Sequence, residues 1–319
     1  MQTREGPPAR NMWHSKGTWG SGRRACQTRL STTGGTPGPG SGSGRYHLSN
    51  MKTKTSGAPI LVGVPFDGQS SFLRGAGEAP GKIREAMACD ASNKWTERGV
   101  DLGTAGIYED AGDLSFSERD AFSVIENGVG VLIDSGKRPV SLGGDHSITY
   151  PIVKALAQRY SELTIFHFDA HPDLYEEFEG NRLSHACPFA RIMEAGLAKR
   201  LVQIGIRTMV AHQREQAKRF GVEVVEMRDL PGYEKLKAAG PVYLTFDMDV
   251  LDPAFAPGIS HREPGGMSVR EAIAHLHAID GNIIGADLVE FNPVRDVSGM
   301  TATVAAKILK EILGKMISG

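Results

Sequence analysis

The chain has 319 residues, of which 40% are hydrophobic, and a formal net charge of −1 at pH 7. This apolar content can build a sizeable core, which excludes a wholly disordered chain, and the near-neutral charge argues against a dedicated nucleic-acid-binding protein. Three cysteines cannot form a disulfide scaffold, so we expect a reducing compartment, the cytoplasm. No apolar run approaches the roughly 18 residues of a membrane-spanning helix, so we expect no membrane partner.

The first fifty residues differ in composition from the rest. They hold ten of the 39 glycines, seven Lys or Arg residues and a single acidic residue, Glu5. This composition predicts a disordered tail, because it offers too little apolar surface to offset the entropy of ordering. Three interpretations remain open: a transit peptide, which would make the protein mitochondrial, an upstream extension before a true start at Met51, or a tail of unexplained role.

Residues 51–319 are expected to form one catalytic domain, in which 29 basic and 36 acidic residues leave a net charge of −7. In chain order, the patterns predict strand 60–65, helix 117–136, strand 138–142, helix 147–160, strand 163–168, helix 185–198, strand 201–206, helix 211–220, strand 222–225, strand 241–248, helix 268–279, strand 283–289 and helix 301–317. This alternation indicates right-handed crossovers and a mainly parallel sheet covered by helices.

Four polar clusters follow predicted strands, at the edge where open parallel sheets bind their ligands. They are Gly-Gly-Asp-His-Ser at 143–147, Asp-Ala-His-Pro-Asp at 169–173, Asp-Met-Asp at 247–249 and Glu-Phe-Asn-Pro at 290–293. In extended backbone, side chains two residues apart fall on one face. Within each of the second and third clusters, alternate side chains therefore share a face: Asp169, His171 and Asp173, and Asp247 with Asp249.

Together with His146, these five side chains would converge above the sheet. Four carboxylates gathered without cations would repel one another and have their pKa values forced up. A pair of divalent cations resolves that conflict, and carboxylates with imidazoles and no thiolates suit Mn²⁺, with Ni²⁺, Fe²⁺, Zn²⁺ or Co²⁺ as alternatives. Two such ions would share a hydroxide, a strong nucleophile at neutral pH.

The clusters at 143–147 and 169–173 and the segment Asp-Met-Asp-Val-Leu-Asp-Pro-Ala-Phe-Ala-Pro-Gly at 247–258 resemble the three signatures of the arginase/agmatinase ureohydrolase family, in the family's order. The similarity covers essentially residues 58–317, and segments 179–186 and 260–266 resemble plant-type arginases in particular. The resemblance implies an α/β fold, a three-layer α/β/α sandwich around an eight-stranded parallel sheet, usually assembled as a homotrimer or homohexamer.

The resemblance also implies roles for individual residues. One metal ion would be held by four side chains: His146, Asp169, Asp173 and Asp247. The other would be held by Asp169, His171, Asp247 and Asp249, with Asp169 and Asp247 bridging, which gives two Mn²⁺ per chain, or Ni²⁺ or another divalent metal. Glu290 would receive a guanidinium group, His185 would shuttle protons, and Asp145 would orient a ligand.

The implied reaction is hydrolysis of a small cationic guanidino substrate to urea and an amine, by attack of the metal-bridging hydroxide. Tyr175 stands where animal and many bacterial arginases carry an Asn that helps bind the amino-acid carboxylate, which favours agmatine, cleaved to putrescine. The plant-type similarity favours L-arginine, cleaved to ornithine, and Glu176, Glu177 and Glu179 would suit a second positive charge on either substrate. Guanidinobutyrate, guanidine and formiminoglutamate remain alternatives.

Simpler interpretations exist for single residues. An Asp after a strand commonly caps a turn, His167 is expected to pack beside Asp169, and the segment Gly75–Gly77 is expected to form a turn before a helix. His275 and His277 are expected to be surface or packing residues, the role of His261 is open, and Cys187 is not expected to be a nucleophile.

Two hypotheses from other classes remain. A non-catalytic ureohydrolase-like protein, acting through its oligomer or a partner, is disfavoured because all six presumed ligands are present. A zinc amide hydrolase of the histone-deacetylase type would bind one metal ion, whereas His171 and Asp249 argue for two.

Overall fold

The computed structural model describes residues 57–116, 120–233 and 236–319. The predicted disorder of residues 1–50 lies outside this range, so the proposed division of the chain at residue 51 stays a prediction. Among the described residues, no helix combines the length and the apolarity needed to cross a membrane.

The described residues form an eight-stranded sheet in the order β2-β1-β3-β8-β7-β4-β5-β6, in which all neighbouring strands run parallel. The strands are β1 (Pro59–Gly63), β2 (Glu109–Asp113), β3 (Arg138–Leu142), β4 (Thr164–Phe168), β5 (Arg200–Ile206), β6 (Glu223–Glu226), β7 (Lys237–Asp247) and β8 (Asp280–Val289). The helices are α1 (Ala79–Met87), α2 (Ala121–Asp134), α3 (Thr149–Ala157), α4 (Pro188–Glu194), α5 (Ala211–Phe220), α6 (Val269–Ala278) and α7 (Met300–Ser318).

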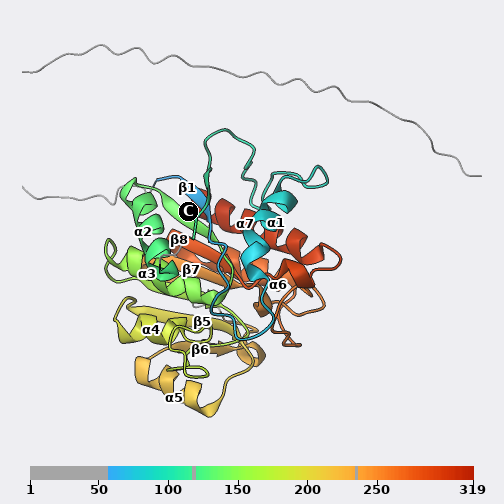
Figure 1. Cartoon of the computed structure of the whole chain (residues 1–319). Coiled ribbons are helices and arrows are strands. Elements are labelled where there is room, and N and C mark those ends of the chain that lie inside the picture. The colour runs from blue at the N-terminus through green and yellow to red at the C-terminus, as the bar shows by residue number, and fades with distance from the viewer. Residues whose placement is uncertain (1–56, 117–119, 234–235) are drawn as a thin grey trace, which may run out of the picture. The chain divides into compact units, whose positions relative to one another are not determined.

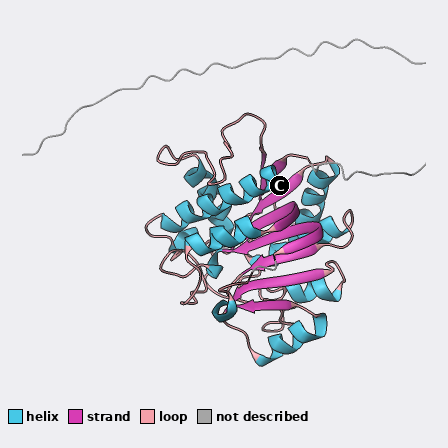
Figure 2. Ribbon diagram, turned by 180° about the vertical axis from the view of Figure 1, so that it is seen from behind, coloured by secondary structure: helices cyan, strands magenta, loops and turns pink. Residues whose placement is uncertain are grey.

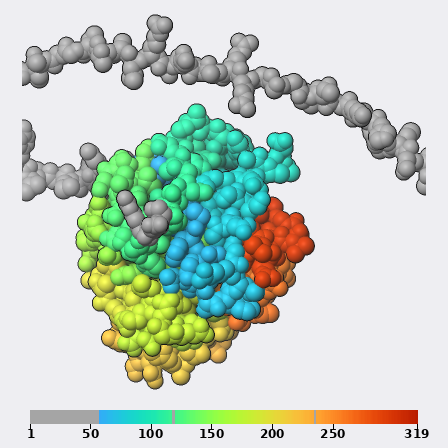
Figure 3. Space-filling model, in the orientation of Figure 1, coloured from blue at the N-terminus to red at the C-terminus, as the bar shows by residue number. Residues whose placement is uncertain are grey.

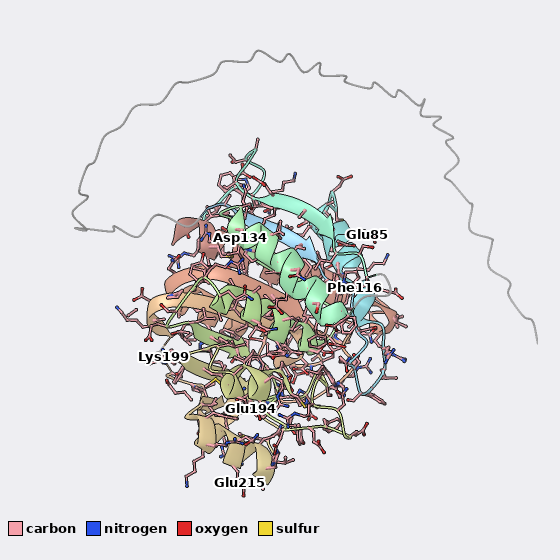
Figure 4. All side chains as sticks on the ribbon, turned by 60° about the vertical axis from the view of Figure 1, so that its left-hand side comes forward. Glu85, Phe116, Asp134, Glu194, Lys199 and Glu215 are labelled. Carbon is pink, nitrogen blue, oxygen red and sulfur yellow. The ribbon has the colours of Figure 1, made fainter. Side chains whose placement is uncertain are left out.

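Helices cover both faces of the sheet and make the three layers that were expected (Figures 1 and 2). On one face, α1, α6 and α7 pack on inward-facing strand residues such as Leu142, Phe166 and Leu244. On the other, α2, α3, α4 and α5 pack on residues such as Ile165 and Tyr243. The layer of α2, α3, α4 and α5 comes forward in Figure 4, where Asp134 of α2, Glu194 of α4 and Glu215 of α5 are labelled. The central strands are therefore buried on both sides, which explains why they read as continuous apolar runs.

Most predicted elements are confirmed, with shifts at their ends. Ser268 caps α6 in a capping box with Glu271, as Ser/Thr residues three positions before a Glu commonly do. The helix expected over 185–198 is shorter, because Pro188 opens α4 and Gly196 takes up a positive φ of 61° just beyond its end. The helix expected over 147–160 is interrupted, since a 3-10 turn, η2 (His146–Ile148), precedes α3.

Strand β2 was not predicted from the sequence. Its five residues, Glu-Asp-Ala-Gly-Asp, are all exposed and carry no large apolar side chain, so no periodic signal marks them. The strand lies at the edge of the sheet, where Arg84 of α1 donates to both Asp110 and Asp113. Tertiary contacts, rather than local propensity, make this edge strand.

Candidate metal centre

Four neighbouring strands in the middle of the sheet, β3, β8, β7 and β4, end at the same level. Phe168 pairs with Phe246, so Asp169 and Asp247 leave the sheet side by side. Asp247 pairs with Val289, directly before Glu290. Leu142 pairs with Leu288, which brings Gly143 and the following His146 to the same edge. The four polar clusters of the sequence therefore meet in space, as the rule for open parallel sheets predicts.

His146 lies at the centre of a first group of side chains. Its Nδ1 atom is 3.1 Å from Oδ2 of Asp169, 3.2 Å from Oδ2 of Asp173 and 3.1 Å from Oδ2 of Asp247. His146 and Asp169 are fully buried, and the other two are nearly so. The structure thus brings together the four residues expected around one ion.

A second group adjoins the first through Asp169. Nδ1 of His171 lies 3.0 Å from Oδ2 of Asp249 and 3.5 Å from Oδ1 of Asp169. One nitrogen or oxygen from each of these three residues lies within 4.8 Å of the others, a spacing that a single metal ion can bridge. With Asp247 two residues before Asp249, the residues expected around the second ion are also neighbours.

The carboxylates are held by backbone N–H groups. Oδ1 of Asp169 accepts from His171 N at 2.6 Å, Oδ1 of Asp247 from Asp249 N at 2.8 Å, and Oδ1 of Asp249 from Ala170 N at 3.1 Å. Asp247 does cap a 3-10 turn, η4 (Met248–Val250), as the simpler interpretation supposed. Capping uses only one oxygen, however, and the second oxygen of each carboxylate faces an imidazole.

One buried atom tests whether these residues fit a cation. Nε2 of His146 hydrogen-bonds Oγ1 of Thr245 at 2.9 Å, whereas its Nδ1 is buried without a hydrogen-bond partner among the described residues. A nitrogen lone pair that faces three carboxylate oxygens is unfavourable unless a positive charge lies between them. Imidazole nitrogens and carboxylate oxygens are the donors that Mn²⁺, Ni²⁺ and Zn²⁺ accept, so the residues fit a pair of divalent cations.

The electrostatics of the cluster lead to the same conclusion. Burial and the charges of Asp249 and Asp169 raise the pKa of Asp247 well above its usual value. Burial would lower the pKa of His146, but Asp169, Asp173 and Asp247 outweigh it and raise that pKa well above its usual value. These two groups are shifted toward their protonated forms, whereas, despite burial, His167, His146 and His171 hold the pKa of Asp169 well below its usual value; both effects show that the cluster favours positive charge.

Glu290 and His185 adjoin this cluster without belonging to it. Nδ1 of His185 lies 2.9 Å from Oε1 of Glu290, and its Nε2 lies 2.8 Å from Oγ of Ser71. The backbone N–H of His146 donates to the same Oε1 at 2.9 Å. Glu290 adopts a positive φ of 61°, as Asp173 does with 47°, a strain that residues at functional sites often carry.

The segment between β1 and α1 supports this arrangement. Gln69 accepts a backbone hydrogen bond from His185, and its side chain accepts one from Asn181 at 2.7 Å. Figure 3 shows this segment, in blue, on the surface beside the yellow-green part of the chain. The base of the segment is fixed by Gly144, where a Cβ atom would lie 1.9 Å from the carbonyl oxygen of Phe66.

These groups open into a pocket of about 150 Å³. It is lined by Ser71, His171, Asp173, Tyr175, Phe178, His185, Ala186, Thr208, Val210, Gln213, Asp247, Asp249, His261 and Glu290. The expectation that Glu176, Glu177 and Glu179 meet the substrate is wrong, because all three are exposed and none lines the pocket. The loop turns them outward, and Glu176 lies 3.5 Å from Arg182.

His167, His277 and Cys187 lie as expected. His167 contacts Oδ2 of Asp169 at 2.6 Å and stacks on Phe189. Burial raises the pKa of the Cys187 thiol to about 12, so it is not a nucleophile at neutral pH. His277 lies 2.9 Å from Glu311 on the outer helix layer.

The hydrogen bonds of Asp145 differ from the expected ones. Its oxygens accept from the backbone N–H of Gln69 at 2.8 Å and from Ser147, rather than from a ligand's imidazole. Asp145 therefore holds the segment before α1, while Thr245 orients His146.

Arg207, which follows β5, was not predicted from the sequence. Its guanidinium donates to the carbonyl oxygens of Asp249 at 2.5 Å and Glu263 at 2.6 Å, and its backbone N–H donates to Ala170 at 2.9 Å. It thus ties together the segments that carry Asp169, Asp249 and His261. No motif marks it, because a lone Arg after a strand has no distinctive spacing.

Comparison with known proteins agrees with this geometry. Residues 58–314 match the arginase family. The chain is 47% identical to arginase 1, mitochondrial, of Arabidopsis thaliana over 287 residues, covering 84% of this chain and 83% of that protein. It is 35% identical to the agmatinase of Bacillus subtilis over 281 residues, which covers 85% of this chain and 96% of that protein. The solved structure of the arginase from Medicago truncatula superposes on this chain with a TM-score of 0.78 at 44% identity. The superposition covers 82% of this chain and 88% of that one. The chain therefore belongs to the arginase family.

Proposed function

We propose that this protein is a binuclear-metal ureohydrolase, which hydrolyses the guanidino group of a small cationic substrate to urea and an amine. One observation carries the proposal: two adjoining groups of imidazoles and carboxylates share Asp169, beside a pocket that contains Glu290 and His185. His146, Asp169, Asp173 and Asp247 would hold one ion, and Asp169, His171, Asp247 and Asp249 the other. Mn²⁺ is the proposed metal, because the donors are oxygen and imidazole with no thiolate.

Two divalent cations at such a site supply an activated water molecule at neutral pH and neutralise negative charge that develops during attack. The protein must then hold the guanidinium carbon against that water. Glu290 is suited to this role, because the charge of His185 holds its pKa below the usual value despite burial. An ionised carboxylate accepts two N–H bonds from a planar guanidinium, which fixes the plane of the substrate.

His185 is the proposed proton donor to the departing amine. Burial would lower its pKa, but Glu290 outweighs this effect and raises the pKa to about 9. The imidazole therefore carries a transferable proton at neutral pH. Ser71, on the opposite nitrogen, keeps the ring oriented toward Glu290.

L-Arginine is the first candidate substrate, because the arginase 1 of Arabidopsis thaliana is 47% identical to this chain and the agmatinase of Bacillus subtilis 35%. Agmatine is the second candidate, and the pocket favours it: no Lys or Arg is among the residues that line it, so no ammonium or guanidinium of the protein is there to pair with an α-carboxylate. Tyr175, which led to the same expectation from the sequence, does line the pocket.

The decisive experiment is urea release from agmatine, L-arginine, guanidinobutyrate and guanidine by protein loaded with Mn²⁺, and again with Ni²⁺. We expect the highest kcat/KM with L-arginine or agmatine, at two metal ions per chain. Two bound ions without urea from any compound would contradict the proposed substrate class. One bound ion per chain would favour the single-metal amide hydrolase instead.

The names of related proteins and the composition of residues 1–50 bear on the localisation of this protein. Relatives from Arabidopsis thaliana and Oryza sativa are named mitochondrial. The acid-poor, Arg-containing composition of residues 1–50 suits a targeting sequence, so we propose the mitochondrion over the cytoplasm. A fluorescent protein fused behind residues 1–56 should enter mitochondria, and cytoplasmic fluorescence would refute this. The family resemblance supports a homotrimer or homohexamer, which light scattering would distinguish.

A further inference from the structure

Three side chains of the pocket form a group of their own, apart from the six proposed metal ligands. They are His185, His261 and Glu290, from three separate loops, and each offers an atom within 4.8 Å of the other two. His185 and Glu290 are only 8% and 5% exposed, and His261 is partly buried. All three line the pocket.

His261 has no assigned role in the proposed reaction. Its ring lies 5.2 Å from the ring of His185 and 6.0 Å from that of His171, measured between centroids. The ring of Phe72 lies beside the His261 ring, with 5.7 Å between the two centroids. Neither ring nitrogen has a hydrogen bond to the described residues, so a nitrogen lone pair is available to a ligand in the pocket.

His185 is prepared to act as a ligand in the same way. Nδ1 of His185 hydrogen-bonds Glu290, and Ser71 lies 2.8 Å from its Nε2. A cation that displaces the Nδ1 proton would take up the freed lone pair, while Nε2–H donates to the Ser71 hydroxyl. A hydrogen bond to the remote nitrogen is the usual way to set the tautomer of a metal-bound His. The backbone N–H of His146 holds the Glu290 carboxylate in turn.

The spacing also suits a small cation. Ligands at about 2.0–2.2 Å in tetrahedral positions lie roughly 3.3 Å from one another. Nδ1 of His185 and Oε1 of Glu290 are already 2.9 Å apart. Two imidazoles and one glutamate form a donor set that Zn²⁺ takes in proteins, with a fourth position left for water.

We propose that His185, His261 and Glu290 form a third cation site, which takes Zn²⁺ and blocks the pocket. A cation there occupies Glu290 and the Nδ1 lone pair of His185, so a guanidinium cannot bind and no proton can be passed to a leaving amine. The binding part concerns these three residues alone, whereas the inhibitory part rests on the proposed function.

Zinc stoichiometry tests the binding part without reference to activity. After equilibrium dialysis of the metal-free protein against Zn²⁺, we expect three zinc ions per wild-type chain and two for His261→Asn. His275→Asn is the matched control, because it removes a half-buried imidazole on α6 that does not line the pocket, and it should keep three. The same zinc content in the wild type and in His261→Asn would overturn the third site, whatever the number of ions held by the neighbouring cluster.

Inhibition tests the consequence. Zn²⁺ added to Mn²⁺-loaded wild-type protein immediately before assay should inhibit competitively with the guanidino substrate. His261→Asn should need at least tenfold more zinc for the same fractional inhibition, whatever its own turnover. Equal zinc sensitivity of the two proteins would refute the block. If neither protein releases urea, the proposed function fails, and the stoichiometry still decides the third site.

Discussion

Three carboxylates at the ends of β4 and β7, those of Asp169, Asp247 and Asp249, each divide their two oxygens between two tasks. Oδ1 of Asp247 accepts a backbone N–H, and its Oδ2 points at His146. Asp249 is held in the same way, by Ala170 N on one oxygen and beside His171 with the other. Backbone anchoring fixes the positions of the proposed ligands before any ion arrives, so little conformational entropy remains to be lost on binding.

Asp247→Ala is expected to abolish activity and to reduce the bound metal. The proposed bridging role places this carboxylate on both ions, and loss even of an outer partner of a metal ligand costs about 10- to 100-fold in metal affinity or activity. Metal per chain and kcat would be measured after dialysis. Asp229→Ala, at an exposed carboxylate, should behave as wild type. A variant at Asp247 that retained two ions and full turnover would disprove the proposed site.

Glu290→Gln should retain both ions and lose most turnover. The amide keeps the size of the carboxylate but cannot pair its charge with a guanidinium, and loss of one well-placed group in a site of this kind costs about 100- to 1,000-fold in rate. The measurement is kcat/KM together with metal per chain. Glu215→Gln, at an exposed residue of α5, is the control (Figure 4). An unchanged kcat/KM would remove Glu290 from the guanidinium role.

The pH dependence follows from His185, whose pKa of about 9 lies above its usual value. The imidazolium is present below this pKa and is lost as the pH rises through it. The stabilising contribution of the His185 imidazolium is fully present below about pH 6.5, the pKa of histidine in the unfolded chain. It is lost as the pH rises through about 9. We expect kcat/KM to fall above about pH 9. His185→Asn should lower the rate and lack this decline; a variant that retained the same decline would exclude His185 as its source.

At the scale of elements, the junction of β3 and η2 has no room for a side chain. A Cβ atom at Gly144 would lie 1.9 Å from the carbonyl oxygen of Phe66, whereas one on Gly81 in α1 would meet nothing within 4 Å. Backbone atoms cannot move aside as a flexible side chain does. The close approach therefore places Asp145 and His146 beside the segment that carries Ser71.

Two glycine substitutions make a matched pair. Gly144→Ala should lower the free energy of unfolding by about 1–3 kcal/mol or more, because overpacked backbone must shift. Gly81→Ala should raise it by about 0.5–1 kcal/mol, since alanine is the better helix former at an open position. Urea denaturation measures both. A Gly144→Ala protein as stable as the wild type would show that this junction is not tightly packed.

At the scale of the whole molecule, every residue of the proposed site lies between Ser71 and Glu290, on segments that the eight-stranded sheet supports. Deletion of residues 1–50 should therefore leave kcat/KM and Tm nearly unchanged. Thermal unfolding and urea release by the truncated and full chains test this. A large loss in either would show that the first fifty residues contribute to the fold or to the site.

The sequence by itself determined the class of fold and the donor set. Apolar runs separated by helical patterns specify a parallel sheet, because strands buried on both faces must be apolar throughout. The spacing within the motifs at 169–173 and 247–249 predicts which side chains lie together, since alternate residues after a strand share a face. Both features are local, so they can be predicted without contacts between distant segments.

Only the tertiary structure decided the rest. The exposed edge strand β2, the bonds of Thr245 to His146 and of Arg207 to three segments, and the outward turn of Glu176 depend on residues far apart in the chain. The same holds for the group of His185, His261 and Glu290, whose members are separated by 76 and 29 positions and carry no shared motif. Such contacts follow from the order and register of the strands, which local periodicity does not encode.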